Sequence, residues 1–359
     1  MPKEPHFNLT LPLDCEETAK EGARSILRSL KPDWTAVELG FMPGGFTNRI
    51  LWASPERGNG RVRILFRIYG RHSEHFIHRE DEKAHMRLLH REGLAPPLHA
   101  SFQNGIVYGF LPGAPLDLGT MRDARVAKAI AKQTATLHAT RLTDQDSQLY
   151  RLQPSKPFLD KLLSWLRELP PFSSLSAGLA DLPTKEELEV EALEMLQLMK
   201  ELHGDRPLVL SHNDLIRNIV WDEADGKVGF IDFEYADYNY QAFDIGTHFA
   251  EYSGADAYPD KQFLKAWLRV YLEAFGDTTR EQMPLEQLFH AVQVSVAIAH
   301  FWCLVWAAKQ AAHFTVHFVE FGRSQFDLFR KRKAEAFPPA QKFLHAKEQI
   351  QAFAAKTQP

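Results

Sequence analysis

Cysteine, excess positive charge and long apolar runs are all scarce in this chain of 359 residues. Its two cysteines, Cys15 and Cys303, exclude a disulfide framework, and nothing indicates an oxidising compartment. Lysine and arginine number 42 against 46 aspartates and glutamates, a formal net charge of -4. No surplus of cations is left to neutralise a nucleic acid backbone or an anionic membrane surface. We therefore expect no nucleic acid partner.

Membrane and secretion signals are also missing. The N-terminal residues carry charges throughout and contain no apolar stretch of signal-peptide length. The longest apolar run, residues 294–308, is interrupted by Ser295 and His300 and is shorter than the ~20 residues that span a bilayer. We expect a buried helix there, no membrane insertion and a cytoplasmic location.

The first third of the chain alternates strand and helix signals in the order β-β-β-α-β-β. Gly44 and Gly45 form the tip of a predicted hairpin, and Pro96 and Pro97 end the predicted helix. The expected strands lie within residues 35–43, 46–54, 61–70, 98–102 and 106–111, and the helix within 75–93.

Helical periodicity dominates beyond residue 113. Helices are expected over residues 122–142 and 157–169, and a capping box at Thr184 and Glu187 begins another. A compact β-rich insert follows at 207–235, and the remainder is helical. The pattern predicts an α+β fold with a small β-rich N-terminal lobe, residues 1–113, and a large, mostly helical C-terminal lobe, residues 114–359.

Two acidic loops in the second half carry the most informative residues. An apolar strand delivers His212 and Asp214 into one loop, Asn218 precedes the next strand, and Asp232 ends a third. Carboxylate and amide oxygens suit Mg²⁺, and a strand end fixes a carboxylate while leaving it open to phosphates. One acid can then accept a hydroxyl proton while the other holds metal.

A single aspartate at such a place is more often a turn or cap residue. The order His-x-Asp, Asn, strand and Asp is, however, that of the catalytic and metal loops of kinases. The Gly44-Gly45 tip, Arg67 on a strand and Glu82 on an acid-rich helix fall in the same order. Each is weak evidence alone, and the order of all of them is stronger.

These residues lie in segments that carry a family resemblance. HNDLIRNIVW, FIDFEYADYNYQAFDIGTHFAEY and FRIYG resemble the choline/ethanolamine kinases, and more closely the ethanolamine kinases. PGGFTNRI and AIAHFWCLVWAAKQ extend the match over residues 41–330. The resemblance implies a protein-kinase-like two-lobed fold. It also implies Mg²⁺-dependent transfer of phosphate from ATP to the hydroxyl of ethanolamine, the first step of the CDP-ethanolamine route to phosphatidylethanolamine.

The resemblance also implies roles for individual residues. Asp214 would be the general base, and Asp232, assisted by Asn218, would hold Mg²⁺. Arg67 would contact phosphate and pair with Glu82. The remaining ATP-binding residues would be a glycine-containing loop over the phosphates and an adenine slot, formed by Gly44, Gly45, Phe46, Thr47, Asn48, Phe110 and Leu111.

An ammonium group is attracted to carboxylates and to aromatic faces, so the alcohol's cationic end would lie among residues of those kinds. The candidates are Glu234, Tyr235, Asp244, Glu251, Trp302, Trp306 and Phe318. Two alternatives stay open. The tryptophans sit in a strongly apolar helix and could be core residues, and Asp244 could be a structural acid that ties the catalytic loop in place.

The chain departs from the family at three positions. Three residues separate Asp214 from Asn218 where the family has four, Cys303 stands in place of the first of two tryptophans, and Thr247 replaces an asparagine. Loss of one aromatic ring around the ammonium group weakens the binding of a quaternary ammonium more than that of a primary one. The reason is that a quaternary ammonium donates no hydrogen bond. This favours ethanolamine over choline.

Two other functions remain as alternatives. One is a choline kinase, and the other is a catalytically impaired, nucleotide-binding module of the same fold. The expected partners are ATP and a small amino alcohol, and the sequence also allows a homodimer.

Overall fold

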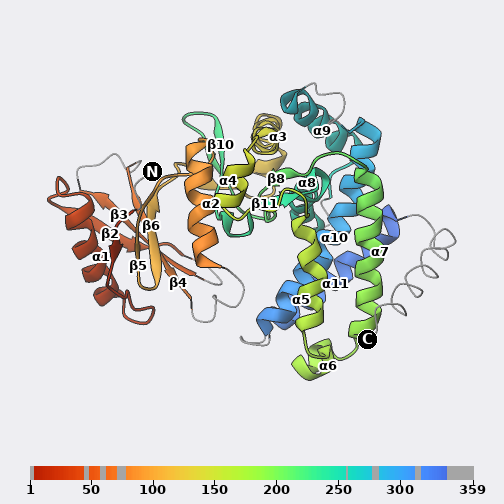
Figure 1. Cartoon of the computed structure of the whole chain (residues 1–359), viewed down its shortest axis with the longest axis horizontal. Helices are drawn as coiled ribbons and strands as arrows, with labels where there is room; N and C mark the ends of the chain where they lie inside the picture. Colours follow the sequence, from red (N-terminus) through yellow and green to blue (C-terminus); the bar gives the residue numbers. More distant parts are fainter. Residues whose placement is uncertain are drawn as a thin grey trace. The chain divides into compact units, whose positions relative to one another are not determined.

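The computed structural model describes residues 4–43, 48–56, 62–70, 78–255, 258–276, 283–311 and 317–337. The chain divides into two compact units (Figure 1). Unit 1 comprises Met1–Ala129, Leu142–Leu152 and Arg217–Ala236, and unit 2 comprises Ile130–Arg141, Gln153–Ile216 and Asp237–Pro359. Each unit thus combines segments that are far apart in the sequence.

Unit 1 contains a six-stranded sheet in the order β1-β5-β6-β4-β3-β2. Neighbouring strands are antiparallel apart from the parallel pair β1 and β5. The strands are β1 (His6–Phe7), β2 (Val37–Phe41), β3 (Asn48–Pro55), β4 (Ile64–Tyr69), β5 (Leu98–Phe102) and β6 (Gly105–Gly109). The predicted β-β-β-α-β-β order is confirmed, and β1 precedes it as a two-residue strand too short to leave a pattern.

The alternation of side chains along β4 separates core from site. Ile64, Phe66 and Ile68 are buried in the core that the sheet forms with α1 (Glu16–Leu30). Because successive strand residues point to opposite faces, Arg67 and Tyr69 lie on the other face. Tyr69 packs there in the cluster that includes Met86 of α2 (Arg79–Arg91).

The β-rich segment expected at 207–235 divides between the units, so the prediction of one compact insert is wrong. β8 (Val209–Ser211) pairs with β11 (Asp237–Asn239) in unit 2. β9 (Ile219–Asp222) and β10 (Lys227–Phe230) form a three-stranded sheet with β7 (Ala114–Pro115) in unit 1. Short apolar strands leave their partners unspecified, since hydrogen-bond pairing depends on contacts that are distant in the sequence.

Helices make up most of the chain after residue 120, as predicted. They are α3 (Ala124–Ala139), α4 (Asp144–Leu149), α5 (Lys161–Glu168), α6 (Phe172–Leu175), α7 (Lys185–His203), α8 (Gln241–Ala250), α9 (Lys261–Phe275), α10 (Leu285–Ala311) and α11 (His317–Ala336), with short 3-10 turns that include η3 (Phe158–Asp160), η5 (Phe233–Tyr235) and η6 (Glu251–Ala255). The capping box is confirmed, since the Thr184 hydroxyl accepts from the Glu187 N–H and the Glu187 carboxylate accepts from the Thr184 N–H.

Helix α10 is the core of unit 2. It has 27 residues, longer than the apolar run that predicts it, and packs against α8 and α11. By length and composition alone it could cross a membrane, but 78% of its most apolar window is buried inside the protein. A core helix passes the same test, and the predicted buried helix is confirmed.

Candidate active site

Arg67 lies at the centre of an ion-pair network in unit 1. Its Nη1 atom donates to Glu82 Oε1 at 2.7 Å, and its Nη2 atom donates to Asp232 Oδ1, also at 2.7 Å. The side chains of Arg67 and Glu82 are only 9% and 1% exposed, whereas that of Asp232 is 31% exposed. The fold thus brings together three predicted residues from β4, α2 and the end of the β10 segment, with one carboxylate at the surface.

Two further charged residues complete this network. Arg79 Nη1 donates to Glu82 Oε2 at 2.8 Å, so each oxygen of Glu82 receives one guanidinium. Glu234 Oε2 lies 3.7 Å from Arg67 Nη1 and 4.0 Å from Arg79 Nη1. The structure therefore puts Glu234, a candidate for the ammonium site, among arginines. Arg79 was not among the predicted site residues, although its spacing of three from Glu82 on a predicted helix was a usable signal.

The charges of this network explain its protonation. Burial alone would lower the pKa of Arg67, but Asp232 and the other acids outweigh it and raise that pKa well above its ordinary value. Burial, followed by the charge of Asp232, raises the pKa of Glu234 well above its ordinary value. If all its groups were ionised, the network would contain three acids against two guanidinium groups and would carry a net negative charge.

Asn218 and Asp232 lie at neighbouring strand ends. β9 and β10 pair antiparallel with Ile219 opposite Phe230, and the Ile231 N–H donates to the Asn218 carbonyl at 3.0 Å. Asp232 follows directly. Within the described residues no group of three or more His, Cys, Asp or Glu side chains forms a metal site. Mg²⁺ needs none, because it is held by one or two protein oxygens together with phosphates and water. The exposed Asp232 carboxylate beside Asn218 fits that ligand set.

Backbone strain is concentrated in the two acidic loops. Among the described non-glycine residues with positive φ, Asn213, Arg217 and Asp232 lie in these loops at 66°, 60° and 66°. Asn and Asp tolerate this left-handed region better than other residues, and such strain is retained where surrounding contacts enforce it. The strain indicates that the fold holds both loops in defined shapes.

The other predicted ATP-binding residues lie on or beside the sheet of unit 1. Asn48 begins β3, and its Oδ1 atom accepts from Arg79 Nη2 at 3.4 Å. The Phe110 N–H donates to the Arg63 carbonyl at 3.2 Å. Leu111 packs onto Gly229 of β10 so closely that a Cβ added to Gly229 would collide with the Leu111 side chain. Four predicted residues lie outside the described residues: Gly44, Gly45, Phe46 and Thr47.

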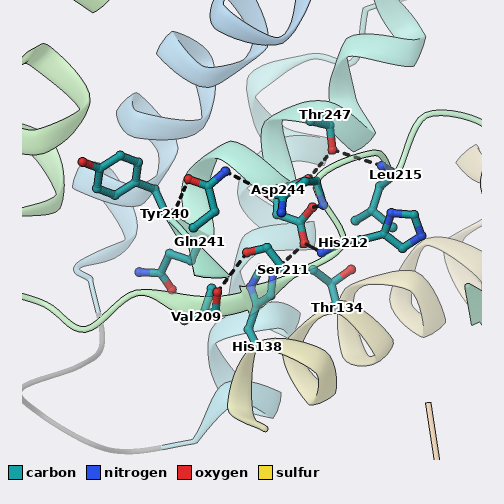
Figure 2. Close-up of polar contacts among 12 residues, drawn as sticks. Thr134, His138, Val209, Ser211, His212, Leu215, Tyr240, Gln241, Asp244 and Thr247 are labelled. Carbon is teal, nitrogen blue, oxygen red and sulfur yellow. Dashed lines mark hydrogen bonds and ion pairs between the residues drawn. The ribbon is translucent and has the colours of Figure 1, made fainter. Parts of the chain in front are cut away.

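In unit 2, the buried carboxylate of Asp244 holds the loop that carries Asp214 (Figure 2). Asp244 Oδ2 accepts from the His212 N–H at 2.9 Å, and Oδ1 accepts from the Asn213 N–H at 2.7 Å. His138 Nε2 lies 2.9 Å from Oδ2. Burial alone would raise the pKa of Asp244, but these partners, His138 first, outweigh it and lower that pKa. Such contacts favour the structural-acid alternative for Asp244.

His138 is itself held from its other side. Its Nδ1 atom lies 2.8 Å from the Tyr271 hydroxyl, which donates to Gln241 Oε1 at 3.1 Å. Because an ionised carboxylate only accepts, His138 must donate from Nε2 to Asp244. Figure 2 shows His138 reaching the loop from α3. Sequence reasoning missed His138 and Tyr271, since nothing local marks a partner more than a hundred residues away.

Thr247, one of the three departures from the family, forms a second tie to this loop. Its hydroxyl donates to the Asp244 carbonyl at 2.7 Å and accepts from the Leu215 N–H at 3.3 Å (Figure 2). The Leu215 amide directly follows Asp214, the predicted general base. Thr247 therefore fixes the backbone on the far side of Asp214 from the Asp244 contacts.

Asp214 itself is partly exposed, and its N–H donates to His212 Nδ1 at 3.3 Å. Cys303 of α10 lies within electrostatic range of Asp214 and Glu251. Burial, followed by the charges of these two acids, raises the pKa of the Cys303 thiol. The charges of the predicted base and of one ammonium candidate thus both act on the Cys303 thiol.

The two tryptophans of α10 have different surroundings. Trp302 is 6% exposed and packs on Trp165 and Phe158, with ring centroids 4.6 and 5.0 Å away. This favours the core alternative for Trp302. Trp306 is half-buried and meets the Phe318 ring edge-on at 5.5 Å. The remaining aromatic candidate, Tyr235, is buried in η5 of unit 1.

Removing the Thr247 hydroxyl should destabilise the protein. Thr247→Val keeps the side-chain shape but removes the hydroxyl oxygen that accepts from the buried Leu215 N–H, which costs about 1–3 kcal/mol. We expect the free energy of unfolding, measured by urea denaturation, to fall by that amount. Thr134→Val is the control, because Thr134 donates to a carbonyl within its own helix, at 2.9 Å, and accepts no loop amide in the contacts described. Equal losses in both variants would contradict the loop role.

His248 makes a pH-dependent contribution that can be measured. It is buried among Phe249, Tyr252 and Trp267, neither ring nitrogen has a hydrogen-bond partner in the described part of the chain, and burial lowers its pKa from 6.5 to about 3. The unfolded state therefore binds a proton that the folded state rejects, and stability falls as the pH drops below 6.5 by about 1.4 kcal/mol per pH unit.

His248→Gln should remove this dependence. We expect the free energy of unfolding of the variant to change less between pH 6.5 and 4.5 than that of the unmodified chain, by about 2–3 kcal/mol over the interval. His317→Gln, at an exposed position on α11, is the control and should keep the steeper dependence. Identical pH profiles for all three proteins would show that His248 is not buried as a neutral ring.

Comparison with known proteins identifies the family. The choline/ethanolamine kinase family model matches residues 39–330. Human ethanolamine kinase 1 is 32% identical over 359 residues, covering 93% of this chain and 76% of the human protein. The Plasmodium vivax ethanolamine kinase structure is 24% identical, with a TM-score of 0.74 over 89% of this chain and 91% of that one.

The likeness of fold extends further. The ternary complex of streptomycin, ATP and APH(2")-IIa is 16% identical, with a TM-score of 0.52 over 89% of this chain and 97% of that one. The predicted protein-kinase-like fold, with a β-sheet region and a helical region, is confirmed. Because the family model matches most of this chain, the chain belongs to the choline/ethanolamine kinase family of enzymes.

Proposed function

We propose that this enzyme transfers the γ-phosphoryl group of ATP to the hydroxyl of ethanolamine, giving phosphoethanolamine and ADP. This is the entry step of the CDP-ethanolamine route to phosphatidylethanolamine. The observation that carries the proposal is the network in which Arg67 bridges the buried Glu82 and the partly exposed Asp232, at 2.7 Å on each side. The relatives of this chain include ethanolamine kinases from several animals, which supports ethanolamine as the acceptor.

The proposed lobes follow the sequence prediction, with an ATP-binding lobe at residues 1–113 and a catalytic lobe at 114–359. In the first lobe Arg67 contacts phosphate, supported by Glu82, and Phe110 and Leu111 line the adenine slot. Contacts also join Arg217–Ala236 to unit 1, so Asp232 belongs by packing to the same body as Arg67.

Asp232 and Asn218 are the residues that would hold Mg²⁺. When bound, the ion would neutralise charge on the ATP phosphates. Their support comes from oxygen chemistry and from the β9–β10 pairing that brings the two residues together. Arg67 shares Asp232 and supplies a planar fork of donors, which matches phosphate oxygens.

Asp214 is the proposed general base. Its carboxylate accepts the proton of the alcohol hydroxyl while that oxygen forms a bond to the γ-phosphorus. The bond from this phosphorus to the bridging oxygen of ADP then breaks, and ADP leaves. The ties of the loop to Asp244 and Thr247 support this role, because a base acts only when it is held in place.

Glu251, Cys303, Trp306 and Phe318 are the proposed surroundings of the ammonium group. Glu251 and Asp214 supply negative charge near the Cys303 thiol, and Trp306 with Phe318 supplies aromatic surface. A primary ammonium donates three hydrogen bonds, whereas a quaternary one relies on aromatic faces. A thiol in a tryptophan position therefore supports ethanolamine over choline. A cytoplasmic location and a homodimer remain parts of this proposal.

A coupled assay of ADP release with each alcohol tests the proposal. We expect a higher kcat/KM for ethanolamine than for choline. Turnover of choline at least as efficient would make the chain a choline kinase. Nucleotide binding without turnover of either alcohol would indicate the catalytically impaired module.

Asp214→Ala should strongly reduce turnover while leaving nucleotide binding intact. Removal of a general base lowers kcat by about 10²–10⁴-fold, and the carboxylate is not proposed to touch ATP. Rates from the coupled assay and the Kd of ADP from calorimetry measure the two effects. Asp205→Ala, at an exposed position of the same unit, should change neither. A parallel loss of ADP affinity in Asp214→Ala would contradict the assigned role.

Cys303→Trp should shift the preference toward choline. An added indole face contributes about 1.4 kcal/mol to binding a desolvated cation, so the choline-to-ethanolamine ratio of kcat/KM should rise about tenfold. Cys303→Leu adds bulk without an aromatic face and serves as the control. An equal rise in both variants would attribute the preference to side-chain volume. No rise in either would show that Cys303 does not belong to the proposed surroundings of the ammonium group.

A further inference from the structure

Arg79 belongs to the ion-pair network around Arg67, and the proposed mechanism gives it no role. It is the first residue of α2, where the positive end of the helix dipole disfavours a cation by about 0.3–1 kcal/mol. Its side chain is nevertheless only 14% exposed. A buried arginine in an unfavourable position on its own helix must be held there by contacts made outside the helix backbone.

Those contacts join four elements of unit 1. Arg79 donates to Glu82 Oε2 at 2.8 Å and to Asn48 Oδ1 of β3 at 3.4 Å. Its guanidinium carbon lies 3.8 Å from the centroid of the Tyr69 ring of β4, a close stacking contact. Glu234 of η5 lies 4.0 Å away. Arg79 is therefore fixed in orientation from several sides.

The shared carboxylate explains what this orientation does. Glu82 gives Oε1 to Arg67 and Oε2 to Arg79, so Arg67 can place only one of its terminal amino groups on Glu82. The other, Nη2, is directed to Asp232. Without Arg79, both oxygens of the buried Glu82 would be open to Arg67, and a two-pronged pairing is the favoured geometry of an arginine with a carboxylate.

We propose that Arg79 is a positioning residue for the phosphate end of the nucleotide. By occupying Glu82 Oε2 it keeps Arg67 Nη2 at the exposed carboxylate of Asp232, where the phosphates of ATP would bind. This inference rests on the proposed function, since it takes Arg67 as the phosphate contact. It predicts that the loss of Arg79 weakens binding of phosphates and leaves recognition of the adenine and ribose unchanged.

Calorimetric titration of the full chain with ADP in the presence of Mg²⁺, and separately with adenosine, tests the proposal. Arg79→Gln should raise the Kd of ADP about tenfold or more and leave the Kd of adenosine unchanged. Arg79→Lys keeps the charge but not the fork, so its Kd of ADP should lie between those of Arg79→Gln and the unmodified chain. Arg91→Gln removes a cation from the last turn of the same helix and should match the unmodified chain.

A double variant separates positioning through Glu82 from direct phosphate contact. If Arg79 acts through Glu82, adding Arg79→Gln to Glu82→Gln should cause little further loss of ADP affinity. In the assay, KM for ATP should rise while KM for ethanolamine stays constant. If Arg79→Gln does not fold, Arg79→Lys carries the same comparison of ADP with adenosine.

Three results would overturn the inference: unchanged ADP affinity in Arg79→Gln, equal loss of ADP and adenosine, or additive losses in the double variant. None of these measurements requires phosphorylation of an alcohol. A chain that turns over neither ethanolamine nor choline but shows the expected ADP pattern would therefore refute the proposed function and leave the role of Arg79 standing.

Discussion

The loop that carries Asp214 depends on the hydrogen bonds that the buried carboxylate of Asp244 accepts. It is fully removed from solvent, and a charge in that position is retained only when hydrogen bonds replace the lost water. Two backbone N–H groups and His138 supply them. The same bonds fix the residues immediately before Asp214, so the demand of Asp244 for partners determines the course of the loop.

Thr247 helps to fix the backbone of the loop between Asp214 and Asn218. The chain passes from unit 2 to unit 1 between Ile216 and Arg217, within the stretch that the family resemblance predicts to be one residue short. Thr247 holds Leu215 before this border, and β9 pairs with β10 just after it. The left-handed backbone of Arg217 lies between these two constraints. The loop is thus held at both ends by hydrogen bonds of the described residues.

The residues around Arg67 and those around Cys303 differ in their electrostatics. Around Arg67, ion pairs surround buried side chains. If all groups were ionised, as a bound cation would favour, three acids would face two guanidinium groups. Around Cys303, two acids act on a neutral thiol, and the nearby indole of Trp302 is committed to Trp165 and Phe158. Aromatic surface for a cation is left mainly to Trp306 and Phe318. This division is consistent with an acceptor that carries a small primary ammonium.

The sequence alone determined the β-β-β-α-β-β order of the first third, the family and the chemical types of the site, because periodicity, turn residues and the HNDLIRN and DFEYADYNY segments are local signals. Only the tertiary structure decided which residues meet. It assigned Glu234 to the arginines, Trp302 to an aromatic stack, β8 to β11, and Arg79 and His138 to the carboxylates they hold. The physical reason is that a carboxylate, an arginine or an indole has many acceptable partners, and the partner it receives is chosen by packing between segments distant in the chain.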